Sequence, residues 1–195
     1  MRIITGTARG MKLETLDGEE IIRPTSDRVK EGLFSAIQFD IAGKRVLDLF
    51  AGSGQLALEA LSRGADSAVI IDESEKAVEI IKTNAKKTNL MKKCRIARQD
   101  YSEYLKSANN REKFGLIFLD PPYSKDIPGE VLKKLCRTDI IEDNGIVVCE
   151  SEHDNMNEDI YNLKFIKKYK YGRTFIAIFT KKDDTGEGEA EKNEN

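Results

Sequence analysis

The sequence predicts a doubly wound α/β domain built on a Rossmann-like, mostly parallel sheet. From residue 44 onward, short and almost continuous apolar runs alternate with amphipathic segments of helical length. This pattern is typical of parallel strands that helices cover on both faces. Near the end, two strand-like runs flank Gly172-Arg173 and predict an antiparallel hairpin. We expect this C-terminal hairpin to complete one edge of the sheet.

Residues 1–24 precede this pattern and predict a small N-terminal β-hairpin extension. Ile3 and Ile4 begin it, and Asp17-Gly18 is a turn signal within it. Pro24 ends the extended structure because it lacks an N–H donor.

A helix is expected directly after the extension. Thr25 or Ser26 can cap it, with Asp27 in its first turn. Its apolar residues recur at helical spacing and give it one buried face: Val29, Leu33, Phe34 and Ile37.

The remaining elements follow in alternation. The predicted parallel strands are 46–49, 68–71, 95–97, 116–119 and 146–149, and the hairpin strands are 165–171 and 174–180. The predicted helices lie near 55–63, 74–88, 101–108 and 128–136. Residues 181–195 contain no large apolar side chain and predict a disordered acidic tail, which leaves 25–180 as the main domain.

The composition bounds the possible functions. The 195 residues include 32 Lys or Arg and 34 Asp or Glu, a net charge of −2, whereas phosphate-binding domains usually carry a basic excess. No apolar run is long enough to span a membrane, and the N-terminus lacks the apolar part of a signal peptide. Three cysteines without a C-x-x-C pair and a single histidine, His153, disfavour disulfides and metal sites. A cytoplasmic protein without a metal is expected.

The strongest local signal is the loop after the first parallel strand, Asp48-Leu49-Phe50-Ala51-Gly52-Ser53-Gly54. Its glycines let the backbone approach a ligand closely, and the helix that follows offers free N–H groups. Ala57 stands where the dinucleotide fingerprint needs glycine, and no P-loop lysine follows. Asp48 suits a ligand that carries an ammonium group. The alternative is a tight turn without a ligand.

Two further carboxylates follow predicted strands. Asp72 ends the second strand, where it can accept from both hydroxyls of a ribose or cap the next helix. Asp100 ends the third strand beside Tyr101, where it can accept from an adenine amino group or cap a helix. Both alternatives stay open for each residue.

The fourth strand is followed by Asp120-Pro121-Pro122-Tyr123. The two prolines fix the backbone and remove two N–H donors. The loop then presents a carboxylate, carbonyl oxygens and an aromatic ring, which together fit a planar amine: the amine donates to Asp120 and to the Pro121 carbonyl, and Tyr123 stacks on the ring. A rigid turn without chemistry is the alternative.

These two loops resemble the S-adenosylmethionine-dependent amino-methyltransferases. The chain is still more similar to the RsmD family, the 16S ribosomal RNA guanine-N2 methyltransferases. The resemblance spans residues 1–180, and the segments that carry it are 2–13, 23–34, 46–54, 58–65 and 171–174. Gln55 departs from the family, which more often has a small residue there.

The resemblance implies S-adenosylmethionine as the cofactor. Its methionine end would be lined by Asp48, Gly52 and Gly54, with Phe50 also at the cofactor site. Asp72 would hold the ribose, and Asp100 with Tyr101 would border the adenine. The catalytic loop would be Asp120, Pro121, Pro122 and Tyr123, which holds a guanine whose exocyclic N2 attacks the methyl group.

Basic residues are unevenly distributed. The resemblance places one set next to the catalytic loop, where RNA contact is expected: Arg2, Arg9, Lys12, Arg23, Arg28 and Lys30. Residues 80–99 form an acid-free basic window for which we favour a solubilising role. Residues 163–173 form a second one, interleaved with aromatics. Both RNA binding and protection of an edge strand against aggregation remain open for it.

The predicted function is therefore methyl transfer from S-adenosylmethionine to N2 of a guanine in 16S rRNA. The rRNA would be free or part of an incompletely assembled small subunit, and the enzyme would act as a monomer. An adenine-N6 methyltransferase acting on DNA or RNA is the nearest alternative, because the same loop can hold either amine. A non-catalytic RNA-binding module is the alternative from another class.

Overall fold

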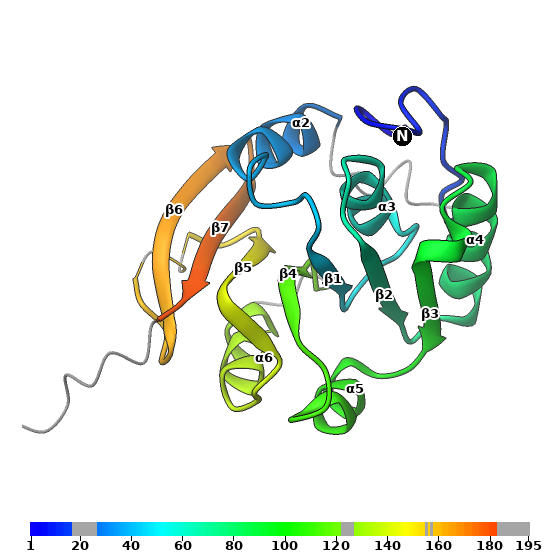
Figure 1. The fold of residues 1–195 in the computed structure, drawn as a ribbon. Coiled ribbons are helices and arrows are strands. Elements are labelled where there is room, and N and C mark those ends of the chain that lie inside the picture. Colours follow the sequence, from blue (N-terminus) through cyan, green and yellow to red (C-terminus); the bar gives the residue numbers. More distant parts are fainter. Residues whose placement is uncertain (17–26, 122–126, 155, 157, 183–195) are drawn as a thin grey trace, which may run out of the picture.

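The computed structural model describes residues 1–16, 27–121, 127–154, 156 and 158–182. The described strands form one seven-stranded sheet in the order β3-β2-β1-β4-β5-β7-β6 (Figure 1). The parallel strands are β1 (Arg45–Asp48), β2 (Ser67–Asp72), β3 (Cys94–Arg98), β4 (Phe114–Leu119) and β5 (Ile141–Ser151). β7 (Thr174–Lys181) pairs antiparallel with β5, and β6 (Leu163–Tyr171) pairs antiparallel with β7. The predicted fold class and the hairpin at one edge are confirmed.

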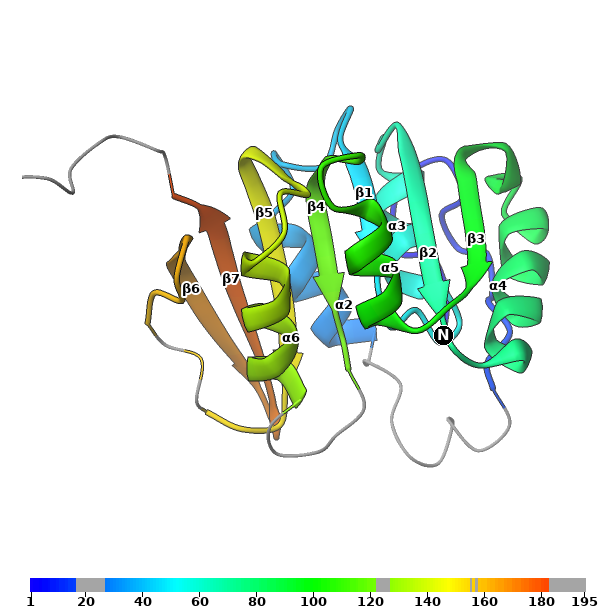
Figure 2. The same ribbon diagram turned by 90° about the horizontal axis from the view of Figure 1, so that it is seen from below.

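Helices cover both faces of the sheet. The described helices are α2 (Asp27–Ala36), α3 (Gln55–Ser62), α4 (Glu75–Lys87), α5 (Tyr101–Ala108) and α6 (Ile127–Cys136), with a 3₁₀ turn, η1 (Met91–Lys93). Apolar side chains of α2, α3 and α4 pack into one core cluster, and those of α5 and α6 into a second on the other face. Figure 2 shows α5 and α6 in front of the sheet, with α2 and α3 behind it. Among the described helices, none combines the length and apolar character needed to cross a bilayer.

The predicted elements differ from the observed ones mainly in β5. The sequence predicts residues 146–149, whereas β5 begins at Ile141. The first half of the strand has no apolar pattern, because the run is interrupted by Glu142, Asp143 and Asn144. Asn144 also has a positive φ of 56°. The pairing of β4 with β5 shifts register between Phe114 and Leu116, so this part is an irregular extension of a buried strand.

Residues 1–16 form a loosely paired segment. An isolated antiparallel bridge joins Arg2 and Lys12, the Ile3 N–H donates to the Met11 carbonyl over 3.0 Å, and the Gly10 N–H donates to the Ile3 carbonyl over 2.8 Å. This segment lies beside α3 and α4 (Figure 1). The turn predicted at Asp17-Gly18, the boundary at Pro24 and the tail after residue 182 lie outside the described residues.

The parallel strands all end at one edge of the sheet, which we call the carboxyl edge. Because β7 runs antiparallel to β5 and Phe175 pairs with Ser151, the turn between β6 and β7 lies at this same edge. Open α/β sheets bind their ligands beyond the carboxyl ends of their strands. The carboxyl edge is therefore where the candidate site is sought.

Candidate functional site

Four predicted carboxylates lie along the carboxyl edge. Asp48 and Asp72 are the last residues of β1 and β2, Asp120 directly follows β4, and Asp100 follows β3 by two residues. These strands are adjacent in the order β3-β2-β1-β4. The fold thus brings together residues that are 72 positions apart, from Asp48 to Asp120.

The glycine loop between β1 and α3 requires its glycines. Gly52 and Gly54 have φ angles of 51° and 78°, in the left-handed region that side chains disfavour. A Cβ on Gly54 would also lie 3.2 Å from Ile81 Cγ2. Gly54 is the N-cap of α3 and has no side chain to accept the free helix N–H groups. Asp48 supplies one acceptor instead, because its Oδ2 accepts from the Ala57 N–H over 3.3 Å.

Asp48 is a buried carboxyl with one unpartnered oxygen. Its exposed fraction is 1%, and Oδ1 has no hydrogen-bond partner. Burial, together with the nearby charges of Asp120 and Asp72, raises the pKa of Asp48 to about 8, although the backbone N–H groups of Ala57 and Phe50 act in the opposite direction. A buried acceptor without a donor is costly. A ligand that brings a cationic donor to Oδ1 would remove this cost.

Asp72 holds the backbone on both sides of the site. Its Oδ2 accepts from the Gly52 N–H and its Oδ1 from the Ser74 N–H, each over 2.8 Å. The N-cap of α4 is Ser74 and not Asp72, since the Ser74 side chain accepts from the Ala77 N–H. The cap alternative for Asp72 is therefore wrong. Its contact with a ribose stays a prediction.

Asp100 is the N-cap of α5. Its Oδ1 accepts from the Ser102 N–H over 2.8 Å and from the Glu103 N–H over 3.0 Å. The cap alternative is thus confirmed for this oxygen, and the adenine contact stays a prediction.

An aromatic pair lies beside Asp100. The rings of Phe50 and Tyr101 are 5.0 Å apart between centroids. Lys134 of α6 places its ammonium 4.9 Å from the Tyr101 ring centroid and donates to Tyr101 Oη over 3.1 Å. Sequence reasoning missed Lys134, since only the packing of α6 beside α5 brings it there.

The loop predicted to be catalytic, residues 120–123, is described only at Asp120 and Pro121. Asp120 is partly exposed and Pro121 is buried. Asp120 lies close enough to Asp48 and Cys149 for its charge to raise the pKa of both groups. The predictions for Pro122 and Tyr123 lie outside the described residues.

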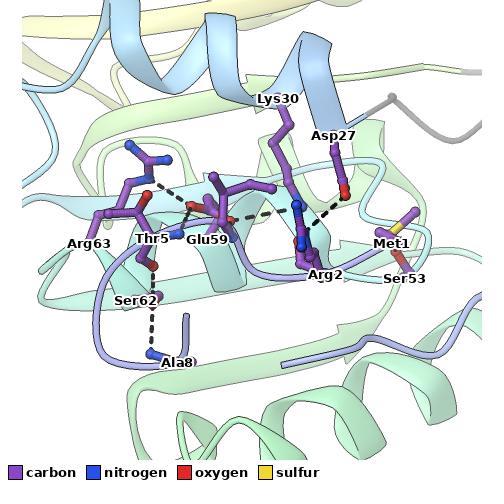
Figure 3. Close-up of polar contacts among 11 residues, drawn as sticks. Met1, Arg2, Thr5, Ala8, Asp27, Lys30, Ser53, Glu59, Ser62 and Arg63 are labelled. Atoms are coloured by element: carbon purple, nitrogen blue, oxygen red, sulfur yellow. Dashed lines mark hydrogen bonds and ion pairs between the residues drawn. The ribbon is translucent and has the colours of Figure 1, made fainter. Parts of the chain in front are cut away.

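Of the six residues predicted to contact RNA, four have exposed side chains: Arg2, Arg9, Lys12 and Arg28. Arg2 forms a 3.3 Å ion pair with Asp27. Arg23 lies outside the described residues. The prediction for Lys30 is wrong, because this lysine is fully buried and donates to the Arg2 carbonyl beside Glu59 (Figure 3).

Glu59 of α3 organises the N-terminal segment, and sequence reasoning assigned it no role. This fully buried carboxylate accepts from the Ile4 N–H over 2.7 Å and the Thr5 N–H over 3.0 Å. Arg63 Nε donates to it over 2.7 Å, and Lys30 Nζ lies 3.9 Å away (Figure 3). Glu59 is the single charged residue of α3, and this was the signal that could have found it.

Two further side chains hold the same segment. Ser62 Oγ accepts from the Ala8 N–H over 3.0 Å and donates to the Thr5 carbonyl over 2.6 Å. Asn84 of α4 donates to the carbonyls of Glu14 and Ser53, each over 2.9 Å. Since Ser53 belongs to the glycine loop, Asn84 connects the N-terminal segment directly to the candidate ligand site. Among the described residues, no group of three or more His, Cys, Asp and Glu side chains is placed to hold a metal ion.

The chain is similar to known proteins over most of its length. Residues 1–180 match the family model described as conserved hypothetical protein 95. The Bacillus subtilis protein YlbH, named as a candidate rRNA methyltransferase, is 38% identical over 184 residues, which are 93% of this chain and 100% of that protein. Ribosomal RNA small subunit methyltransferase D of Escherichia coli K12 is 36% identical over 157 residues, 80% of this chain and 76% of the relative.

A solved structure agrees with these relatives. The Escherichia coli protein yhhF, described as a candidate methyltransferase, superposes with a TM-score of 0.82 at 30% identity. The superposition covers 93% of this chain and 98% of that one.

Proposed function

Because the chain belongs to the RsmD family, we propose that it is an S-adenosylmethionine-dependent rRNA methyltransferase that methylates N2 of a guanine in 16S rRNA. The relatives are named as rRNA methyltransferases, which supports rRNA methylation. The name of methyltransferase D also specifies the small ribosomal subunit. The choice of guanine N2 rests on the resemblance of the chain to the family, and the experiment below tests it.

The observation that carries the proposal is the unpartnered, buried oxygen of Asp48 beside a glycine loop with two left-handed residues. S-adenosylmethionine carries an ammonium group on its methionine end, which is the kind of donor that Asp48 Oδ1 lacks. Gly52 and Gly54 would line that end, with Phe50 beside them. Asp72 would hold the ribose, and Asp100 with Tyr101 would border the adenine. Bound there, the cofactor supplies an electrophilic methyl group on its sulfonium.

Asp120 and Pro121 would hold the target amine. The amine donates one hydrogen to the Asp120 carboxylate and the other to the Pro121 carbonyl, which leaves the nitrogen lone pair free for in-line attack. Positioning the two reacting atoms about 3 Å apart contributes much of the rate, so no strong base is needed before attack. The proton leaves late, to Asp120 or to water. Pro122 would keep the loop rigid, and Tyr123 would stack on the base.

The target base must leave its stack to reach this loop, since the amine is inaccessible inside a helix. We infer that Arg2, Arg9, Lys12, Arg23 and Arg28 hold the RNA near it. We further propose that the enzyme acts as a monomer in the cytoplasm, on 16S rRNA in an incompletely assembled small subunit.

The proposal is tested by incubating the protein with methyl-labelled cofactor and separate pools of 16S rRNA, 23S rRNA, tRNA and DNA. Label in N2-methylguanosine of 16S rRNA is expected. Label in N6-methyladenine would instead support the adenine-specific alternative. Asp120→Ala should abolish transfer and leave binding of S-adenosylhomocysteine intact. If the wild-type protein binds rRNA tightly but transfers no methyl group to any pool, it is a binding module and not an enzyme.

A further inference from the structure

The end of the β6–β7 hairpin carries exposed basic residues on both of its faces. Lys167 lies on the face that packs against α2, near Arg28 of that helix, whereas Lys170 projects from the opposite face and Arg173 lies in the turn. We call these four residues the hairpin surface. All four side chains are exposed. Among the described residues, no carboxylate forms an ion pair with any of them, whereas Lys168 of the same strand is paired with Asp154. No acidic residue occurs between positions 163 and 173.

Strand register places this surface at the edge where the reaction would occur. Leu119 pairs with Cys149, Cys149 with Ala177 and Ala177 with Lys168. Lys168 is therefore level with Leu119 in the sheet, and residues 169–173 continue beyond that level in the same direction as Asp120. Three strand spacings of ~4.8 Å separate β4 from β6, so the hairpin surface begins about 15 Å from Asp120. A bound RNA strand covers that distance in a few nucleotides.

The hairpin end is anchored on α2. A Cβ on Gly32 would lie 2.0 Å from Tyr171 Oη, so the absence of a side chain at position 32 lets Tyr171 reach the helix. The Tyr171 ring stacks on Tyr169 with 6.4 Å between centroids and 18° between planes, and Lys167 Nζ lies 5.1 Å from the Tyr169 centroid. Arg28 and Tyr171 interact electrostatically across the same contact. These contacts fix Lys167 beside Arg28, and on the opposite face of β6 the Lys170 ammonium lies 5.2 Å from the Phe175 ring centroid. An anchored hairpin end loses less entropy when it binds a ligand.

We propose that the hairpin surface binds the phosphates of the RNA strand that flanks the target nucleotide. This inference rests on the proposed function and extends it, because it names the part of the protein that orients the substrate. Four exposed cations around one anchored hairpin end, none of them in an ion pair within the described residues, complement a phosphate backbone.

Lysines on an edge strand can also serve only to prevent edge-to-edge aggregation, a role that charges of either sign fulfil. Charge reversal separates the two roles. The test variant is Lys167→Glu/Lys170→Glu/Arg173→Glu, which keeps the edge charged. The matched control is Lys82→Glu/Lys86→Glu/Lys92→Glu, which changes the net charge equally on exposed positions of α4 and η1.

Binding of a fluorescent 16S rRNA transcript is measured for both variants and the wild type at several salt concentrations. We expect the hairpin variant to bind at least tenfold more weakly than the control. We also expect the slope of log K against log salt to fall by about 2, since each phosphate contact on a single strand contributes about 0.7. Calorimetry with S-adenosylhomocysteine should give the same affinity for all three proteins, which shows that the variants are folded.

Equal RNA affinity and equal salt slopes for the hairpin variant and the control would overturn the proposal. If the hairpin triple variant does not bind S-adenosylhomocysteine, the single variants Arg173→Glu and Lys82→Glu replace the pair, with about a threefold difference expected. The proposed function fails separately, when the wild-type protein itself transfers no methyl group to N2 of a guanine in 16S rRNA, whatever its affinity for the RNA. If the wild type methylates rRNA and both variants bind RNA with the wild-type affinity, only the proposed role of the hairpin surface is refuted.

Discussion

At the scale of single residues, Asp48 combines a structural cost with a proposed role in binding the cofactor. Its Oδ1 is buried without a partner, and burial raises its pKa to about 8. The folded protein therefore holds a proton on Asp48 at pH values where the unfolded chain has already lost it. A cationic ligand reverses this preference, because it stabilises the ionised carboxylate.

The first prediction concerns the stability of Asp48→Asn. Between pH 4 and pH 8 the unfolded chain binds fewer protons at this position than the folded protein, so the Asp48 contribution to the free energy of unfolding falls as pH rises. The fall is at most about 1.4 kcal/mol per pH unit. Asparagine does not titrate, so the variant should match the wild type near pH 4 and exceed it at pH 8 in urea unfolding.

The same substitution should weaken the binding of S-adenosylhomocysteine, measured by calorimetry at pH 8. Asp72→Asn is the control for stability. It replaces an acceptor of two backbone N–H groups and should lower the free energy of unfolding at both pH values. A variant of Asp48 that is less stable than the wild type at pH 8 would contradict the raised pKa.

At the scale of elements, the N-terminal segment is held to α3 by buried charge. Glu59 accepts from two backbone N–H groups of the segment, and Lys30 of α2 donates to the Arg2 carbonyl beside it. Burial lowers the pKa of Lys30, while the charge of Glu59 raises it. Three elements thus meet at one ion cluster.

The second prediction compares the two ends of this cluster. Glu59→Gln leaves the buried Lys30 and the partly buried Arg63 beside a neutral side chain, and should lower the free energy of unfolding by about 3–5 kcal/mol. Lys30→Met keeps Glu59 paired with Arg63 and with both backbone N–H groups, so the loss should be no more than about 2 kcal/mol. Urea unfolding measures both. Equal losses would show that Lys30, not Arg63, is the main partner of Glu59.

The third prediction uses two glycines of the same segment as a matched pair. Gly6 and Gly10 have similar φ angles, 86° and 82°, so alanine is strained at both. A Cβ on Gly6 would lie 1.8 Å from the Ser62 carbonyl oxygen, whereas a Cβ on Gly10 would contact nothing within 4 Å. Gly6→Ala should therefore detach the segment from α3, and Gly10→Ala should cost only about 1–2 kcal/mol of strain.

This detachment is measured by hydrogen exchange of the Thr7 and Ala8 amides, because both amides donate to Ser62. Faster exchange in Gly6→Ala than in Gly10→Ala is expected. The same exchange rates in the two variants would show that backbone strain, and not the close approach to Ser62, sets the stability of the segment.

At the scale of the whole molecule, the net charge of −2 conceals an uneven distribution. Residues 181–195 carry three basic and six acidic side chains, which leaves 29 basic and 28 acidic for residues 1–180, a net charge of +1. Phosphate attraction alone should therefore give modest, salt-sensitive affinity for RNA. Shape and local basic surfaces must contribute the rest of the selectivity.

The fourth prediction follows from this balance. An assembled or partly assembled small subunit that lacks the modification should be methylated with a kcat/KM at least tenfold above that of naked 16S rRNA. Initial rates of methyl transfer at physiological salt measure this ratio. A naked transcript that serves equally well would show that the RNA sequence alone directs the enzyme.

The fifth prediction is that the protein is a monomer of 22.0 kDa in light scattering at micromolar concentration. The large apolar side chains that are exposed in the described residues, Phe39, Tyr161 and Ile166, do not form a continuous patch along one element. The free side of β6 carries lysines, which disfavour edge-to-edge pairing. A mass of 44 kDa, twice the monomer value, would contradict this expectation.

Much of the fold could be predicted from local patterns. The alternating apolar runs marked the five parallel strands, and Gly172-Arg173 marked the hairpin turn, because periodicity and turn chemistry are properties of neighbouring residues. The carboxylates of the candidate site could be found for the same reason: each follows an apolar strand. The main part that was missed is the first half of β5, where three polar residues interrupt the strand. The 3₁₀ turn η1 and the first two residues of β6 were also not predicted.

The sequence by itself thus determined the fold class, the order of the elements and the positions of Asp48, Asp72, Asp100 and Asp120 at strand ends. Only the tertiary structure decided that Lys30 is buried against Glu59, and that Asp72 holds the glycine loop. It also decided that the β6–β7 turn lies at the carboxyl edge. The physical reason is distance along the chain. Secondary structure follows from neighbouring residues, whereas the burial and pairing of a charge depend on residues that are far apart in sequence, such as Ile4 and Glu59, which are 55 positions apart.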